Sequence, residues 1–193
     1  MCSGAAVRLA ALWLAVTALF SMSITGIVRA QEALPEPPAE VSAEPPYTVA
    51  AERTVHNLIN LFRLDHGLRP LESDDVLVDL ARARCAIMAE TGRVEHDIPG
   101  LGFGPDWLIS QVRGPGLGRV GENLGASGYS NDVAMWSLFD AWVESPSHLE
   151  NLLRPEYSRV GVGVVEIPTR IPGVSVKYVA QVFAVASGPL TRV

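Results

Sequence analysis

Residues 159–186 read RVGVGVVEIPTRIPGVSVKYVAQVFAVA, with β-branched residues on both sides of a segment rich in Pro and Gly. The two flanks, 159–167 and 174–186, alternate in part between apolar and small or polar side chains, which is typical of β-strands. Residues 168–173 between them contain two prolines and a glycine, which favour a turn. This stretch therefore predicts two antiparallel strands near the carboxyl end of the chain.

The sequence before this hairpin has helical periodicity. Over residues 51–66 the apolar side chains recur at intervals of three and four, and Gly67 follows as a stop signal. A second helix is expected from Asp74, with Ser73 as its cap, and Gly92 ends the apolar pattern. These two helices precede a long segment with little periodicity.

That segment, residues 93–121, is rich in glycine and contains one short helical pattern at 105–112. Residues 132–144 then form a strongly amphipathic pattern that predicts a longer helix. Ser145 followed by Pro146 predicts the start of another short helix. Residues 122–127 are a candidate third strand. Helices before strands predict an α+β domain, with helices covering one or both faces of a small antiparallel sheet.

The amino-terminal fifty residues differ in composition from the rest. Residues 9–20, LAALWLAVTALF, follow Arg8 and resemble the apolar core of a signal peptide, with small residues near an expected cleavage site after Ala30. The alternative is an uncleaved anchor, because residues 9–28 are about long enough to span a bilayer. In either case the domain is expected to be exported.

These features predict the organisation of the chain. We expect residues 1–30 to be a signal peptide, 31–50 a linker rich in Pro, Glu and Ala, 51–188 the domain and 189–193 a tail. Cys2 falls in the signal peptide, so no disulfide can form within the mature chain. Cys85 falls in a helical pattern, where we expect it to fill the core rather than to act as a reactive thiol.

The charge balance excludes two classes of partner. Without Arg8 and Arg29 of the leader, the chain has 13 basic and 21 acidic side chains, and Lys177 is its single lysine. Nucleic acid is therefore not an expected partner, since no cluster of Lys and Arg can neutralise phosphates. Strong electrostatic attraction to anionic membranes is not expected either.

Three polar side chains are candidates for chemistry. His96 and His148 each lie beside a turn or loop, and Glu122 lies between them in the sequence after Gly121. Two imidazoles and a carboxylate can bind a divalent metal, a polar ligand, or a substrate for acid–base chemistry. Their spacing alone is a weak signal, because no short metal-binding motif connects them.

Four segments resemble bacterial secreted domains of the CAP superfamily, the cysteine-rich secretory and pathogenesis-related group. They are VHNLINLFRLDHGLRPLESDDVLVDLARARCAIMAETGRVEH (55–96), GRVGENLGAS (118–127), WVESPSHLENLLRPEYSRVGVGVV (142–165) and YVAQVFA (178–184). The resemblance implies a three-layer α/β/α sandwich and a cleft shared by two histidines and acidic residues. In this sequence His96, Glu122 and His148 match those positions, and we expect them to line the cleft and to be the metal ligands, with Zn, Ca or Mg as the candidate ion.

The chain departs from the plant and animal members of this family at two features. Their second glutamate lies three residues after the helical tryptophan, where this chain has Ser145 after Trp142, and Glu144 is one residue away. Glu144 is therefore a further candidate for the cleft. Their disulfides are absent here, so we expect the domain to be held by packing around four aromatic residues: Trp107, Trp136, Trp142 and Phe183.

Three functional hypotheses follow. The first is an extracellular or cell-envelope binding module, expected to be a monomer, whose cleft holds a divalent metal or a small ligand such as a lipid. The second is a hydrolase that uses a metal-activated water, or His and Glu as an acid–base pair. The third is an interaction protein of the envelope. No nucleophile with a partner at a recognisable spacing is present, so the sequence favours binding over catalysis.

Overall fold

A computed structural model describes residues 46–193, so the predicted leader and residues 31–45 of the predicted linker lie outside the described residues. The helices are α1 (Tyr47–Asp65), α2 (Asp75–Thr91), α3 (Gly104–Ser110), α4 (Asn131–Glu144) and α5 (Pro146–Leu153). The strands are β1 (Glu72–Ser73), β2 (Asp97–Ile98), β3 (Gly102–Phe103), β4 (Val112–Arg113), β5 (Val120–Ser127), β6 (Arg159–Pro168), β7 (Ser175–Ala184) and β8 (Thr191–Arg192).

The main sheet has the strand order β1-β6-β7-β5. β6 and β7 form the predicted antiparallel hairpin, and β5 joins the other side of β7, also antiparallel. The prediction of a third strand at 122–127 is confirmed, since β5 contains these residues. β1 pairs with β6 in parallel over two residues, so the sheet is antiparallel except at this edge.

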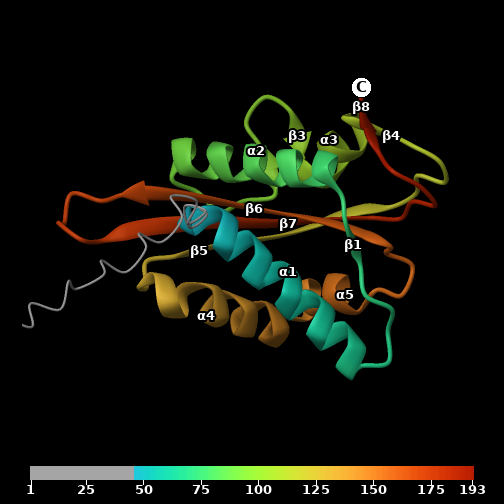
Figure 1. The fold of residues 1–193 in the computed structure, drawn as a ribbon. Coiled ribbons are helices and arrows are strands. Elements are labelled where there is room, and N and C mark those ends of the chain that lie inside the picture. Colours follow the sequence, from blue (N-terminus) through green and yellow to red (C-terminus); the bar gives the residue numbers. More distant parts are fainter. Residues whose placement is uncertain (1–45) are drawn as a thin grey trace, which may run out of the picture. The chain divides into compact units, whose positions relative to one another are not determined.

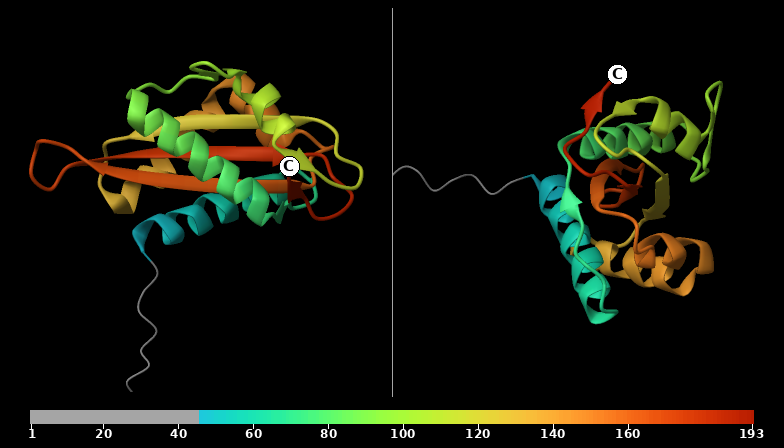
Figure 2. Two further views of the ribbon diagram at one scale, coloured as in Figure 1. Left: turned by 90° about the horizontal axis from the view of Figure 1, so that it is seen from above. Right: turned by 90° about the vertical axis from the view of Figure 1, so that its right-hand side faces the viewer.

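Helices cover both faces of the sheet, as Figure 1 and Figure 2 show. α2 and α3 lie on one face, while α1, α4 and α5 lie on the other. Each face has its own cluster of buried apolar side chains. The predicted three-layer α/β/α sandwich is therefore confirmed.

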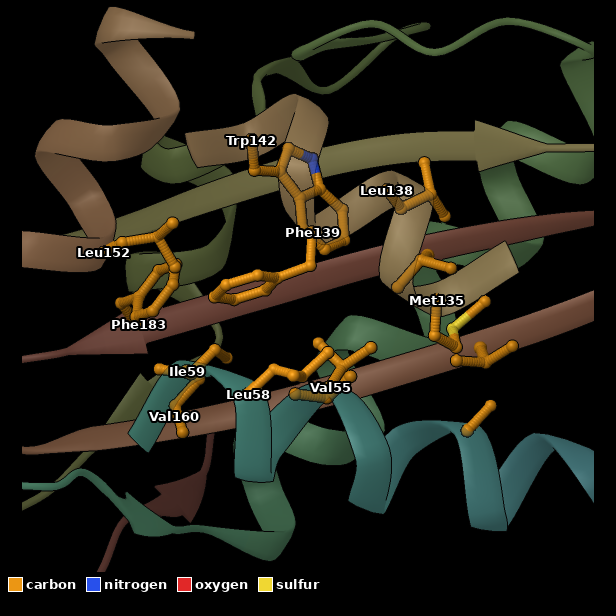
Figure 3. Packing of buried hydrophobic residues seen from close by; sticks show 14 of the residues in the cluster. Val55, Leu58, Ile59, Met135, Leu138, Phe139, Trp142, Leu152, Val160 and Phe183 are labelled. Atoms are coloured by element: carbon orange, nitrogen blue, oxygen red, sulfur yellow. The ribbon is translucent and has the colours of Figure 1, made fainter. Parts of the chain in front are cut away.

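The layer of α1, α4 and α5 contains the larger aromatic residues. In Figure 3, Phe139 of α4 points toward Phe183 of the sheet and toward Ile59 of α1, whereas the Trp142 indole lies on the side away from α1. The Trp142 indole is 2% exposed, and its Nε1–H donates a hydrogen bond to the Leu124 carbonyl at 2.9 Å. This bond satisfies the polar atom of a buried tryptophan, as burial requires.

Two local predictions were wrong. The cap of α2 is Asp74, whose carboxylate accepts hydrogen bonds from the backbone N–H groups of Val76 and Leu77, while Ser73 belongs to β1. Trp136 does not pack in the core but is 55% exposed. It lies on the outer face of α4, because the neighbouring positions Met135 and Phe139 take the inward face.

Both ends of the described domain have regular structure. α1 begins at Tyr47, a few residues before the periodic pattern starts. At the other end β8 pairs with β4, so residues 191–192 are part of a small second sheet. None of the helices within residues 46–193 is long and apolar enough to cross a membrane.

Candidate functional site

A cleft of about 340 Å³ lies between the loop after α2, the start of β5, and α5. It contains all three residues predicted by resemblance, His96, Glu122 and His148. Phe103 and Tyr157 contribute aromatic surface to the same cleft. Segments far apart in the sequence are thus combined into one concave site.

Glu122 forms the floor of the cleft. Its side chain is fully buried, and both oxygens have partners. Arg84 of α2 donates from Nε to Oε2 at 2.8 Å and from Nη2 to Oε1 at 3.0 Å. His96 Nδ1 lies 2.9 Å from Oε1. The bidentate contact with a guanidinium is a strong charge-assisted pairing that fixes the position of the carboxylate.

Residues 121–123 have separate roles because alternate residues of a strand face opposite sides. Glu122 faces Arg84 of α2, whereas Asn123 faces α5. Asn123 Nδ2 donates to the carbonyl of His148 at 3.1 Å, and it also donates to Oε1 of Gln181 at 2.9 Å. β5 therefore positions His96 through the carboxylate of Glu122 and His148 through the side-chain amide of Asn123.

Gly121 is required where the strand meets α5. A Cβ atom at this position would overlap the hydroxyl of Tyr157 and crowd Oδ1 of Asn151. Asn151 in turn donates to Oδ1 of Asn123 at 3.0 Å and to the Glu122 carbonyl at 3.2 Å. The glycine lets α5, which carries His148, lie directly against β5.

The two imidazoles face each other across the cleft, with ring centroids 6.5 Å apart. Burial, and secondarily repulsion from His96, lowers the pKa of His148 below its ordinary value, which favours the neutral form of this ring. His96 donates its Nδ1–H, since the Glu122 carboxylate that pairs with Arg84 acts as the acceptor. The Nε2 atom of His96 then carries an unshared lone pair. This tautomer is assigned from the hydrogen bond between Nδ1 and Glu122.

As a metal site, the cleft does not match the three-ligand set that the resemblance implies. Within residues 46–193 no group of three His, Cys, Asp or Glu side chains is arranged to hold an ion. Glu122 is already paired through both oxygens. The donors that remain for a metal are the outer nitrogens of His96 and His148, with Glu122 acting through His96 as an outer carboxylate.

Glu144, the fourth candidate from the sequence, is not brought to the site. It ends α4, is exposed, and does not line the cleft. The chain turns at Ser145 between α4 and α5, and this turn separates Glu144 from His148.

Sequence reasoning missed the pairing role of Arg84. It continues the inward-facing pattern of α2 with Leu80, Ala81 and Met88, and it is fully buried. A charged side chain at an apolar position of a helix was the available signal, because such a group is buried only when it is paired. Tyr157, which also lines the cleft, is 3% exposed and stacks on Phe183, and its hydroxyl donates to Oδ1 of Asn151 at 3.3 Å.

The cleft is not the largest concave region in the described part of the chain. A groove of about 520 Å³ lies between the end of β5 and α4, lined by Tyr129, Leu138 and Ala141 among others. The residues that line this groove include no histidine and no carboxylate. We place the site at the smaller cleft because polar groups with defined orientation converge there.

The profile of the cysteine-rich secretory protein (CAP) family matches residues 56–182. Among curated proteins, the uncharacterized protein YkwD of Bacillus subtilis is 32% identical over 125 residues, which cover 65% of this chain and 46% of that protein. The uncharacterized membrane protein YlbC of the same organism is 27% identical over 114 residues, 59% of this chain and 31% of that protein. The chain spans less than half the length of either relative.

Two solved structures share the fold. An extracellular protein containing a SCP domain from Bacillus anthracis has a TM-score of 0.56 at 24% identity, with 70% of this chain and 40% of that chain covered. An outer surface protein from Borrelia burgdorferi has a TM-score of 0.56 at 19% identity, with 72% of this chain and 94% of that chain covered. The profile match covers most of the domain that contains the cleft, and the chain therefore belongs to the CAP, or cysteine-rich secretory protein, family.

Proposed function

We propose that this domain is an exported binding module whose cleft takes a small ligand between His96 and His148. The observation that carries the proposal is that both imidazoles face one cleft, and one of them is oriented by a buried, ion-paired carboxylate. Export is supported by the leader-like sequence and by relatives named as extracellular or outer surface proteins.

The chemistry of the cleft defines the class of ligand. An imidazole nitrogen can offer a lone pair, so the ligand between His96 and His148 is expected to be a hydrogen-bond donor or a metal ion. The charges of Arg84 and Glu122 compensate each other, so the floor does not attract a strongly charged ligand. A divalent transition metal such as Zn²⁺ suits two imidazole nitrogens, with other ligands completed by water.

The first experiment measures metal content and thermal unfolding of the full chain with added Zn²⁺, Ca²⁺ or Mg²⁺. We expect Zn²⁺ to stabilise the wild type, by about 2.7 kcal/mol at a hundredfold excess over Kd. The stabilisation should disappear in His96→Ala and in His148→Ala. His66→Ala is the matched control, because His66 is exposed at the end of α1, and it should respond as the wild type does.

Two results would contradict a metal site at the cleft. In one, Zn²⁺ stabilises both cleft variants as much as the wild type. In the other, no ion stabilises the wild type, and organic ligands are then tested in the same assay. A lipid would use the apolar groove beside α4, and its binding would be unaffected by His96→Ala but weakened by Leu138→Ser.

A second candidate function is general acid–base hydrolysis. It is favoured by the hydrogen bond from His96 to Glu122, because this orientation leaves Nε2 as a base that faces the cleft. Turnover of an activated ester such as p-nitrophenyl acetate is the measurement. The catalytic hypothesis requires turnover that is lost in His96→Ala and in His148→Ala while both variants remain folded, and that survives in His66→Ala.

A further inference from the structure

Arg84 is the least expected residue of the site. It lies in the middle of α2, and its side chain is 1% exposed. Three of its contacts involve one guanidinium nitrogen: Nη2 donates to Glu122 Oε1, to the Glu95 carbonyl at 2.8 Å and, more weakly, to the His96 carbonyl at 3.4 Å. A buried charge destabilises the folded protein unless it is fully paired. The Arg84 guanidinium is therefore restricted to the position in which these contacts form.

All of these contacts help to fix the position of His96. The bonds to the carbonyls of residues 95 and 96 hold the loop that carries this histidine. The pair with Glu122 holds the carboxylate that accepts from the His96 ring. Gly104 closes the same arrangement, because its N–H donates to the His96 carbonyl at 2.8 Å and a Cβ there would overlap Glu122.

We propose that Arg84 is a positioning residue that holds His96 in the Nδ1–H tautomer and leaves Nε2 as an acceptor toward the cleft; this assignment rests on the proposed function. Arg84 holds Glu122 through both oxygens, so that Oε1 lies against Nδ1 of His96. A carboxylate oxygen held in this way by a guanidinium is an acceptor, so Nδ1 of His96 is the donor. Arg84 thus acts on the ligand-binding atom from the far side of the carboxylate, without lining the cleft.

The test reads the tautomer directly, by side-chain ¹H–¹⁵N correlation spectra of the full chain labelled with ¹⁵N-histidine. In the wild type we expect the His96 Nδ1 to be protonated and Nε2 unprotonated. In Arg84→Met the contacts to both Glu122 oxygens and to the carbonyls of residues 95 and 96 are lost, so Oε1 is no longer held against Nδ1 of His96. The His96 signals should then move away from the single tautomer, and Zn²⁺ affinity should fall about tenfold.

Arg82→Met is the matched control. Arg82 is two residues earlier on the same helix and pairs with Glu52, away from the cleft. This variant loses an Arg–Glu pair and the stability that the pair contributes, but it should keep the His96 signals and the Zn²⁺ affinity of the wild type. Arg84→Lys retains the charge but loses the bidentate contact with Glu122, so its His96 signals should shift, by less than those of Arg84→Met.

The assignment is overturned if folded Arg84→Met shows wild-type His96 signals. If Arg84→Met does not fold, Arg84→Lys decides: unchanged His96 signals overturn the assignment, and shifted signals support it. The spectra are recorded without ligand, so a failure of the proposed function can be distinguished from a failure of the Arg84 assignment. If Zn²⁺ does not bind the wild type but the His96 tautomer changes in the Arg84 variants, the positioning role of Arg84 is supported and the metal site is refuted.

Discussion

At the scale of single residues, the site depends on how one carboxylate is shared. Glu122 serves Arg84 on one side and His96 on the other, and its side chain is fully buried. Its chemical effect is therefore exerted through the imidazole. His148 is held differently, by its backbone carbonyl, which accepts from Asn123. The two histidines are thus electronically different although they share one cleft.

This difference predicts a pH dependence of stability. The pKa of His148 is lowered in the folded protein, by burial and by the facing His96 ring, so below its ordinary value of about 6.5 the unfolded chain binds more protons. The contribution of His148 to stability is then present above pH 6.5 and lost as the pH falls through the lowered pKa. We expect the free energy of unfolding, measured with urea in the presence of a chelator, to fall more steeply below pH 6.5 in the wild type than in His148→Gln. Parallel pH profiles of the two proteins would refute this origin.

At the scale of elements, α2 owes its position to two glycines of β6. A Cβ at Gly161 would overlap the backbone of Leu77 and Val78, and one at Gly163 would overlap that of Ala81 and Arg82. The helix backbone therefore lies directly on the strand. Because Arg84 is one turn beyond Leu80, this close packing also sets how far its guanidinium reaches toward Glu122.

Gly161→Ala is expected to destabilise the domain by about 3 kcal/mol, since backbone atoms must move apart to accept the methyl group. Urea unfolding followed by circular dichroism measures this change. Gly128→Ala is the control: a Cβ at Gly128, which is exposed after β5, would meet no atom within 4 Å. A loss of stability at Gly128 as large as that at Gly161 would show that the effect is not one of helix–strand packing.

At the scale of the whole domain, the sheet separates two apolar clusters. One lies beneath α1, α4 and α5 and includes Trp142, and the other lies beneath α2 and α3 and includes Cys85. β7 contributes side chains to both clusters, for example Phe183 to the first and Val182 to the second. We expect the two layers to unfold together, because neither cluster is complete without the sheet.

Cys85 and Trp142 report on the two layers separately. Burial raises the pKa of the Cys85 thiol to about 12, so it is almost entirely protonated at pH 8 and unreactive toward a disulfide reagent. In a Cys2→Ser background, thiol reactivity and loss of the folded Trp142 indole NMR signal should occur at the same urea concentration. Reaction of Cys85 at a lower concentration, with Trp142 still folded, would show that the α2 layer opens independently.

The sequence alone determined the elements and the family. The hairpin of residues 159–184 and the periodic helices were predictable because alternation and helical period are local properties of the chain. His96, Glu122 and His148 were predicted from the resemblance, and the structure places them in one cleft. The cap of α2 was misplaced by one residue, since Ser73 and Asp74 are both good capping residues.

Only the tertiary structure decided the partners of these groups. Arg84 and Glu122 are 38 residues apart, and nothing local to either of them indicates the other. Trp136 and Trp142 lie on one helix, yet Trp136 is exposed and Trp142 buried, because only one face of α4 packs into the apolar cluster. Glu144 is separated from the cleft by the turn at Ser145. The physical reason is common to all three: periodicity sets which residues share a face, whereas the contacts of that face depend on how distant segments pack.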